Sequence, residues 1–264
     1  MAKSNERRAM MFSIIIPNYN NASWLDRLFE SIYNQRRKDY EIIFADDCST
    51  DNSIEIATKW AQKFDGKMTI ARSSVKRWNG GTRNIAITFA TGKYILFIDS
   101  DDYFADNECL DTIGRAIEQN DYPDLVRLSY YYCASNEERP VDLSWQDTIE
   151  KIVHDENVAC WTKCIKREKF VPFPENTLKE DVAQHIAQLD AVDTVAVCPK
   201  PIIKWNRNNP NSCSSNKELQ GGKFISSLYR KYADLLDLIV SKPECQRELE
   251  LRRAQAKEDI KREI

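Results

Sequence analysis

The carboxylate-rich segment Asp99-Ser100-Asp101-Asp102 directly follows the apolar run YILFI (94–98). Like charges this close repel one another, so we expect a positive group to neutralise them. Carboxylate oxygens suit Mg²⁺ or Mn²⁺, which complete their coordination with water and substrate phosphates. The segment therefore indicates a metal site that holds a diphosphate. The alternative is a solvated turn that caps the following helix, and the pattern alone leaves both open.

Four short apolar runs predict buried strands in the first part of the chain, at 12–17, 40–45, 67–72 and 94–98. Helical patterns separate them, and the last of these covers residues 81–90. Strands that alternate with helices, in near-continuous apolar runs, predict an α/β fold with a mostly parallel sheet covered on both faces. In such sheets ligands bind beyond the carboxyl ends of the strands.

Three polar clusters stand at predicted strand ends: Pro17-Asn18-Tyr19-Asn20, Asp46-Asp47 and Asp99-Ser100-Asp101-Asp102. Because carboxyl ends of parallel strands meet at one edge of a sheet, we expect these clusters to line one crevice.

The pattern loosens after residue 105. We predict strands at 124–132, 160–165 and 194–199, a helix at 178–189, a polar loop at 134–140 and a flexible loop at 207–216. Apolar residues spaced along one face predict a further helix over 223–240, followed by a charged tail that is helical or partly disordered.

Composition narrows the class of protein. A chain of 264 residues with 42% hydrophobic residues suits one large domain with an appendage, and a net charge of −3 argues against broad nucleic-acid binding. There is no signal-peptide pattern and no apolar run of about 18 residues, so we expect a cytoplasmic protein. The eight cysteines are expected to be buried free thiols; Cys160 and Cys164 lack the further ligands of a zinc site.

Four motifs carry a family resemblance. In order and spacing, IIIPNYNNASWLDRLFESIYNQ, YEIIFADDCSTDNS, GGTRNIAI and YILFIDSDDYF resemble the inverting family-2 glycosyltransferases of the GT-A fold. The resemblance is strong over 12–104 and weaker to about 215. It implies a GT-A domain over 1–216, with a nucleotide-sugar half at 12–104 and an acceptor half at 105–216. Residues 217–264 would form a helical, charged extension.

The resemblance also implies a donor site. Pro17, Asn18 and Tyr19 would line the nucleotide pocket, with the Tyr19 ring against the base. Asp47 would accept a hydrogen bond from the imide N–H of uracil, which favours a uridine donor. The alternatives are a half-buried tyrosine and a carboxylate at a helix N-terminus. Cys48 replaces the glycine usual in the family.

For the phosphates and the metal, the resemblance assigns Arg83 to the diphosphate, with a surface arginine as the alternative. Asp99 and Ser100 would lie near the ribose and the metal. Asp101 would be the principal ligand of Mn²⁺ or Mg²⁺, and Asp99 a second one.

For catalysis the resemblance points to the Glu180-Asp181 pair, with Asp181 as the general base that activates an acceptor hydroxyl. The alternative is a pair of carboxylates in the first turn of a helix. His185 shares the helix face of Asp181 and would touch the acceptor or the metal, or pack as an ordinary histidine. Trp161 and Lys163 would flank the acceptor, with core burial of Trp161 as the alternative.

The resulting hypothesis is an inverting, metal-assisted transfer of a sugar from a nucleotide sugar to a glycan or lipid-linked glycan. A non-catalytic scaffold of the same fold remains the alternative. A haloacid-dehalogenase-type phosphotransferase is disfavoured because its D-x-D follows the first strand. An oxidoreductase is disfavoured because no G-x-G-x-x-G is present. The helix at 223–240 would dock on the inner face of a membrane, on a second subunit, or back on the catalytic domain.

Overall fold

The computed structural model describes residues 10–135, 137–155, 157–175, 180–212 and 240–262. Within them the strands are β1 (Phe12–Asn18), β2 (Tyr40–Asp46), β3 (Met68–Arg72), β4 (Tyr94–Phe97), β5 (Tyr103–Phe104), β6 (Leu125–Ala134), β7 (Glu137–Val141), β8 (Lys163–Lys166) and β9 (Val195–Asn206). The α-helices are α1 (Ala22–Tyr33), α2 (Ser53–Lys63), α3 (Trp78–Ile87), α4 (Cys109–Gln119), α5 (Ile149–Val153), α6 (Glu180–Ala191) and α8 (Pro243–Arg262).

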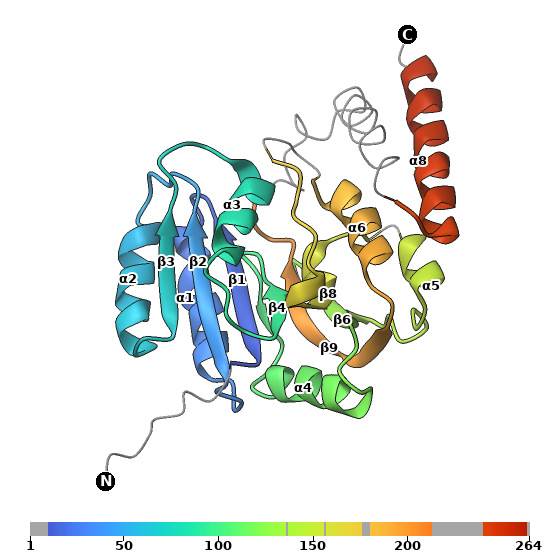
Figure 1. Cartoon of the computed structure of the whole chain (residues 1–264). Helices are drawn as coiled ribbons and strands as arrows, with labels where there is room; N and C mark the ends of the chain where they lie inside the picture. Colours follow the sequence, from blue (N-terminus) through green and yellow to red (C-terminus); the bar gives the residue numbers. More distant parts are fainter. Residues whose placement is uncertain (1–9, 136, 156, 176–179, 213–239, 263–264) are drawn as a thin grey trace.

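The described strands form one sheet in the order β3-β2-β1-β4-β8-β6-β9-β5, and β7 pairs with β6 (Figure 1). The predicted parallel sheet is confirmed in the first half: β1 pairs in parallel with β2 and β4, and β2 with β3. In the second half β8 runs antiparallel between β4 and β6, whereas β9 returns parallel to β6.

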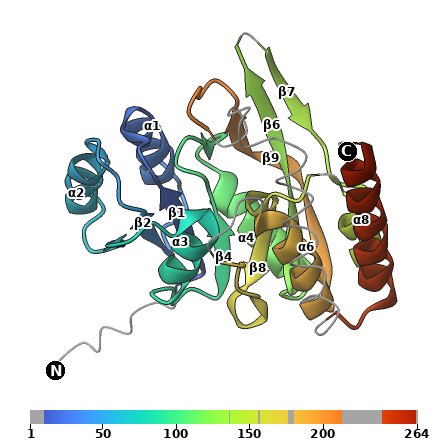
Figure 2. The same ribbon diagram turned by 90° about the horizontal axis from the view of Figure 1, so that it is seen from above.

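The helices cover both faces of the sheet. From β1 the chain continues to the neighbouring strands β2 and β3, and then returns past β1 to β4 on its other side. Because such connections are right-handed, α1 and α2 cover one face of the sheet and α3 covers the other. Figure 2 shows this separation, with α6 on the same side as α3. The reversal of strand order beside β1 is the point where sheets of this class bind ligands.

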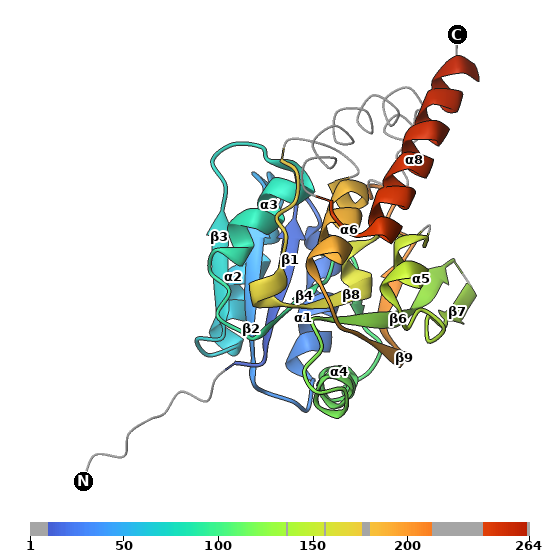
Figure 3. The same ribbon diagram turned by 45° about the vertical axis from the view of Figure 1, so that its right-hand side comes forward.

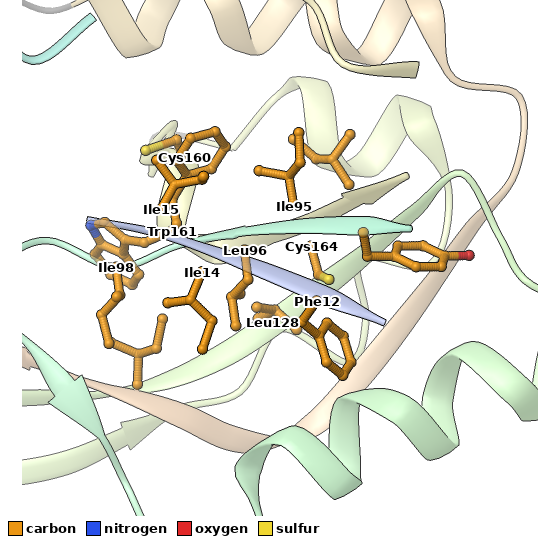
Figure 4. Close-up of a cluster of buried hydrophobic side chains, with 14 of the residues drawn as sticks. Phe12, Ile14, Ile15, Ile95, Leu96, Ile98, Leu128, Cys160, Trp161 and Cys164 are labelled. Carbon is orange, nitrogen blue, oxygen red and sulfur yellow. The ribbon is translucent and has the colours of Figure 1, made fainter. Parts of the chain in front are cut away.

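The middle of the sheet is buried on both faces, which explains the continuous apolar runs. Every residue of β1 and β4 is buried. Figure 4 shows the core formed by Phe12, Ile14, Ile15, Ile95, Leu96, Ile98, Leu128, Cys160, Trp161 and Cys164. The described cysteines are free thiols, and all of them except the half-buried Cys48 are buried as predicted.

Several predicted boundaries differ from the structure. The helix expected at 81–90 is α3, at Trp78–Ile87, and the strand expected at 194–199 is β9, which continues to Asn206. The prediction of a polar loop at 134–140 is wrong. Glu137–Val141 forms the edge strand β7, whose side chains face solvent. The strand expected at 160–165 begins with a 3₁₀ helix, η1 (Cys160–Thr162), and becomes β8 only at Lys163. Apolar side chains such as Trp161 are buried in either conformation, so composition alone does not separate the two.

The C-terminal helix α8 packs against α5 and α6 (Figure 3). Of the helix predicted at 223–240, all but Val240 lies outside the described residues, so its proposed contacts stay predictions. No helix among the described residues combines the length and apolar character needed to cross a membrane.

Gly92, in the turn before β4, lets that turn approach β1 closely. Its N–H donates to Ser13 Oγ (2.9 Å) and Glu41 Oε1 (3.0 Å). A Cβ at Gly92 would lie 2.6 Å from the backbone nitrogen of Ser13 and 2.7 Å from the carbonyl carbon of Phe12. Backbone atoms of a central strand cannot move aside as a flexible side chain can.

We therefore expect Gly92→Ala to lower the free energy of unfolding by about 1–3 kcal/mol, the usual cost of overpacking. Urea unfolding measures this. Adding Ser13→Ala should not restore stability, because backbone atoms remain in the way. Wild-type stability in Gly92→Ala would contradict the described approach.

Candidate active site

Arg83, on α3, is the central group of the site and has only 1% of its side chain exposed. Its Nη2 lies 2.8 Å from Asp99 Oδ1, and its Nη1 lies 2.6 Å from Glu180 Oε1 and 3.6 Å from Asp181 Oδ1. Burial alone would lower the pKa of the guanidinium, but the surrounding negative groups hold that pKa well above its ordinary value. Arg83, expected to contact a diphosphate, thus joins the end of β4 to the start of α6.

Glu180 and Asp181 begin α6 with different environments. Glu180 is buried, and burial and the neighbouring Asp181 raise its pKa to about 7 although Arg83 opposes the rise. Asp181 keeps a quarter of its side chain exposed (25%). Burial raises its pKa, again against the charge of Arg83. Its Oδ1 is buried without a hydrogen-bond partner among the described residues. Asp181 is therefore the member of the pair that a substrate can reach.

The carboxylates after β4 are held by asparagines from the end of β9. Asn209 Nδ2 donates to Asp101 Oδ2 (2.7 Å), and the backbone N–H of Asn206 donates to Asp102 Oδ1 (2.8 Å). Burial and the negative charge of Asp99 raise the pKa of Asp101 to about 6. Asp102 Oδ2 is buried without a hydrogen-bond partner in the described part of the chain.

This donor set is compatible with a hard divalent ion. Negative charge accumulates around Asp101, and the guanidinium of Arg27 is directed at the main-chain oxygen of that residue (3.5 Å). Among the described residues no group of three or more His, Cys, Asp or Glu side chains is arranged to hold a metal. Asp101 and Asp99 are the carboxylates that would hold such an ion, and Mg²⁺ or Mn²⁺ commonly completes its coordination with water and phosphate.

Asp47, which follows β2, is held by the segment that begins α3. Its Oδ1 accepts the N–H of Arg77 (2.7 Å) and its Oδ2 that of Trp78 (2.9 Å). Asp47 therefore lies at the N-terminus of a helix, α3, which is the alternative that the sequence left open for this residue. The ammonium of Lys76 lies 3.2 Å from Asp47 Oδ2 and 2.8 Å from the centre of the Tyr19 ring.

The ends of β1 and β2 are fastened together by polar side chains. Asn18 is buried and donates to Asp46 Oδ1 (2.9 Å) and Ser49 Oγ (3.1 Å). Pro17 is buried within β1. Tyr19, by contrast, is 46% exposed. Of the three residues expected to line a nucleotide pocket, Tyr19 is the one that presents a side chain to solvent.

Ser100 is buried as well, and its Oγ accepts a hydrogen bond from Asn21 Nδ2 (2.8 Å). The Oδ1 of Asn21 accepts another from Asn209 (3.1 Å). The turn after β1, the turn after β4 and the end of β9 are therefore joined by one chain of amide and hydroxyl contacts.

Three turns at the site contain non-glycine residues in the left-handed region. These residues are Asn20 (φ 51°), Cys48 (φ 64°) and Trp78 (φ 59°). Cys48 stands where the family resemblance expects glycine, and its positive φ explains that expectation. Backbone strain of this kind persists only where surrounding contacts hold it, and it is common at functional sites.

The residues expected near an acceptor lie mostly in the interior. Lys163 and His185 have no exposed surface. The Lys163 ammonium donates to the carbonyls of Val158 (2.9 Å) and Ala159 (3.1 Å), and burial lowers its pKa to about 7. Trp161 is 3% exposed and packs on Tyr130 with ring centres 4.9 Å apart. In this conformation none of the three presents a surface to an acceptor, and the core alternative holds for Trp161.

Several site residues were missed from the sequence, above all Lys76, Asn206 and Asn209. Lys76 stands in a polar link between β3 and α3 with no motif of its own. Asn209 lies in the segment RNNPNSCSSN (207–216), whose composition favours a flexible loop, and Asn206 directly precedes that segment. The strand predicted at 194–199 ends well before this segment, whereas β9 continues to Asn206, so the prediction did not indicate that the asparagines follow a strand end.

Comparison with known proteins places this geometry in a family. Residues 13–168 match the family model described as glycosyl transferase family 2. A poly(ribitol-phosphate) beta-glucosyltransferase of Bacillus spizizenii is 41% identical over 103 residues, which cover 38% of this chain and 16% of that protein. The chain thus spans about one sixth of the length of the first curated relatives it matches.

Solved structures share the fold. Staphylococcus aureus TarS 1–349 in complex with UDP-GlcNAc matches with a TM-score of 0.76 at 22% identity, covering 90% of this chain and 69% of that chain. The mannosyltransferase PcManGT of Pyrobaculum calidifontis, in complex with GDP-Man and Mn²⁺, matches with a TM-score of 0.65 at 15% identity, covering 92% and 68%. The α/β sheet flanked by helices that was predicted is therefore the GT-A fold.

Replacing Arg83 tests its position as the shared cation of three carboxylates. We expect Arg83→Met to lower the free energy of unfolding by roughly 3–5 kcal/mol near neutral pH, since it leaves buried carboxylates without a partner. Arg83→Lys, which keeps the charge but loses the fork geometry, should lose less.

The deficit of Arg83→Met should shrink as pH falls from about 8 to about 5, because the unpaired carboxylates take up protons and Glu180 already has a pKa of about 7. Urea unfolding at several pH values measures it. Arg77→Met, at a partly exposed arginine 3.7 Å from Glu175, is the control and should change little. A deficit independent of pH would contradict the electrostatic role.

Proposed function

We propose that this chain, which belongs to glycosyl transferase family 2, moves a sugar from a uridine diphosphate donor to a hydroxyl group of a glycan acceptor. One observation carries the proposal: Arg83 pairs with Asp99 after β4 and lies 3.6 Å from Asp181 at the start of α6. One buried cation thereby holds two carboxylates near each other. Asp99 is the carboxylate next to the expected phosphate site, and Asp181 is the expected general base.

The donor would lie along the carboxyl ends of β1, β2 and β4. Its base would stack on the exposed Tyr19 ring and donate an imide N–H to Asp47, as the family resemblance implies. Support for a uridine nucleotide comes from TarS, which was solved with UDP-GlcNAc. PcManGT was solved with GDP-Man, so guanosine donors belong in any test.

Asp101, with Asp99, would hold Mn²⁺ or Mg²⁺ beside the diphosphate. When bound, such an ion supplies positive charge that stabilises a leaving diphosphate. Asn209 orients the Asp101 carboxylate through its hydrogen bond to Oδ2 (2.7 Å). Arg83 acts behind the site, because its guanidinium is buried and orients Asp99 and Asp181. Arg83 would therefore position the carboxylates and would not make the direct contact with the phosphates that the family resemblance had implied.

Asp181 would take the proton of the acceptor hydroxyl as that oxygen attacks the anomeric carbon. The attack comes from the face opposite the diphosphate, so the new bond forms as the old one breaks and the configuration inverts. The raised pKa of Asp181 suits this role, because a stronger base accepts the proton more readily. The acceptor would be a polymer glycan, in keeping with the relative whose name gives poly(ribitol-phosphate) as its substrate.

The base assignment predicts the kinetics of Asp181→Asn. We expect turnover to fall by about 10²–10⁴-fold, the usual contribution of a general base, with donor affinity nearly unchanged. In the wild type, turnover should rise with pH along an acid limb that lies above the ordinary range of an aspartate, because the pKa of Asp181 is raised. Initial rates of sugar transfer across pH measure both.

Glu55→Gln, an exposed carboxylate on α2, is the control and should leave both quantities unchanged. Full activity of Asp181→Asn, or a product of retained configuration, would refute the mechanism. Loss of donor binding together with turnover would point to a structural role instead.

Donor class and metal dependence are tested together by binding. We expect one UDP-sugar to bind more tightly than GDP- and dTDP-sugars, and Mn²⁺ or Mg²⁺ to strengthen that binding. Asp101→Ala should abolish the gain from metal while leaving metal-free affinity within a few-fold. Isothermal titration calorimetry with and without EDTA measures this. Preference for a GDP-sugar, or equal affinity without metal, would overturn the corresponding part of the proposal.

A further inference from the structure

Lys76 lies in the short segment between β3 and α3, and its ammonium lies in the position proposed for the donor base. The nitrogen is 2.8 Å from the centre of the Tyr19 ring and 3.2 Å from Asp47 Oδ2. An ammonium over a tyrosine face is attracted by the negative face of the ring. The ammonium also lies 5.7 Å from the centre of the Trp78 ring. Its two nearer partners, Tyr19 and Asp47, are the groups that the proposed function assigns to the base.

The two contacts reproduce what a base would do. A planar base covers the Tyr19 ring and donates an N–H to the Asp47 carboxylate. The ammonium covers the same ring and pairs with the same carboxylate. With the nitrogen 2.8 Å from the ring centre, that ring face has no room for a base. Lys76 and a stacked base thus exclude each other.

The remaining contacts of Asp47 make the exchange possible without rebuilding the site. Asp47 also accepts the backbone N–H groups of Arg77 (2.7 Å) and Trp78 (2.9 Å). A carboxylate has about four acceptor positions, so these bonds fix its orientation and leave room for a further donor. Lys76 fills that position now, and a base N–H would fill it after the exchange.

Only a side chain has to move. About a third of the Lys76 side chain is exposed (34%), so its ammonium can reach water by rotating about its own side-chain bonds. The backbone that follows stays anchored through the N–H groups of Arg77 and Trp78.

We propose that Lys76 is an internal substitute for the base, occupying the base site when no nucleotide is bound and leaving it when one enters. The inference rests on the proposed function, because it requires Tyr19 and Asp47 to bind the base. It adds that the protein competes with its own donor. A ligand must then take over the Tyr19 ring face and the ion pair with Asp47.

Uridine is the sharpest probe, because it carries the base without the phosphates whose charge Lys76 would also attract. We expect Lys76→Ala to bind uridine roughly three- to tenfold more tightly than wild type, the range implied by loss of a partly exposed cation–π contact. Lys76→Arg keeps a cation for the same site and should stay near wild type. 3-Methyluridine, which lacks the imide N–H, should bind more weakly than uridine to every variant.

The matched control is Lys63→Ala, because Lys63 also places its ammonium over an aromatic ring, 3.9 Å from the centre of Trp60, on α2. Its removal should leave uridine affinity unchanged. Competition calorimetry or ligand-observed NMR measures each affinity. If wild type binds uridine or UDP and Lys76→Ala binds uridine equally or less tightly, the inference fails and the proposed function stands. If neither protein binds uridine or UDP, the proposed donor fails and the inference fails with it.

A second measurement follows Lys76 directly. Acetylation of lysines by acetic anhydride, read by mass spectrometry, should become faster at Lys76 when UDP saturates the protein, because the ammonium is released to water. Acetylation of Lys63 should not change. Slower acetylation of Lys76 with UDP would mean that the ammonium stays against the nucleotide, and would overturn the exchange.

Discussion

The site depends on one buried guanidinium. Arg83 has almost no exposed surface, and a charge so buried is tolerated only with partners that neutralise it. Asp99, Glu180 and Asp181 provide that neutralisation, and they come from opposite halves of the chain. The carboxylates in turn require the cation, because three negative groups this close would otherwise repel one another. The pairing therefore sets where the end of β4, the helix α3 and the start of α6 lie relative to one another.

The turns around this centre are held by polar contacts rather than by apolar packing. Asn18 ties the end of β1 to Asp46 at the end of β2, and Asp47 binds the backbone at the start of α3. These contacts hold residues such as Cys48 and Trp78 in the left-handed region. Within this polar frame the Tyr19 side chain is 46% exposed, and Asp181 keeps a quarter of its side chain exposed. The sheet beneath supplies the rigidity that the turns lack.

Local patterns predicted much of this arrangement. The apolar runs at β1, β2 and β4 are buried on both faces, so their strands were visible as continuous segments, and parallel topology placed the polar clusters at one edge. The pairing of Arg83 with Glu180, 97 residues away, was not predictable, because nothing near either residue distinguishes a buried partner from a solvated one. The contact of Asn209 with Asp101 spans 108 residues and has the same cause. Lys163, predicted beside an acceptor, is buried because its long side chain reaches the carbonyls of its own turn.

Both ends of the crevice contain a cation paired with carboxylate, yet the two cations differ in what they allow. Arg83 is enclosed, forks to two separate carboxylates and has no route to solvent, so its contacts belong to the fold. Lys76 is one-third exposed, holds its partners through a single flexible ammonium, and can exchange them for water. Planar forked donors suit permanent pairing, and flexible point charges suit exchange. In the proposed exchange, arginine at one end and lysine at the other would separate the part of the site that must persist from the part that a ligand would have to displace.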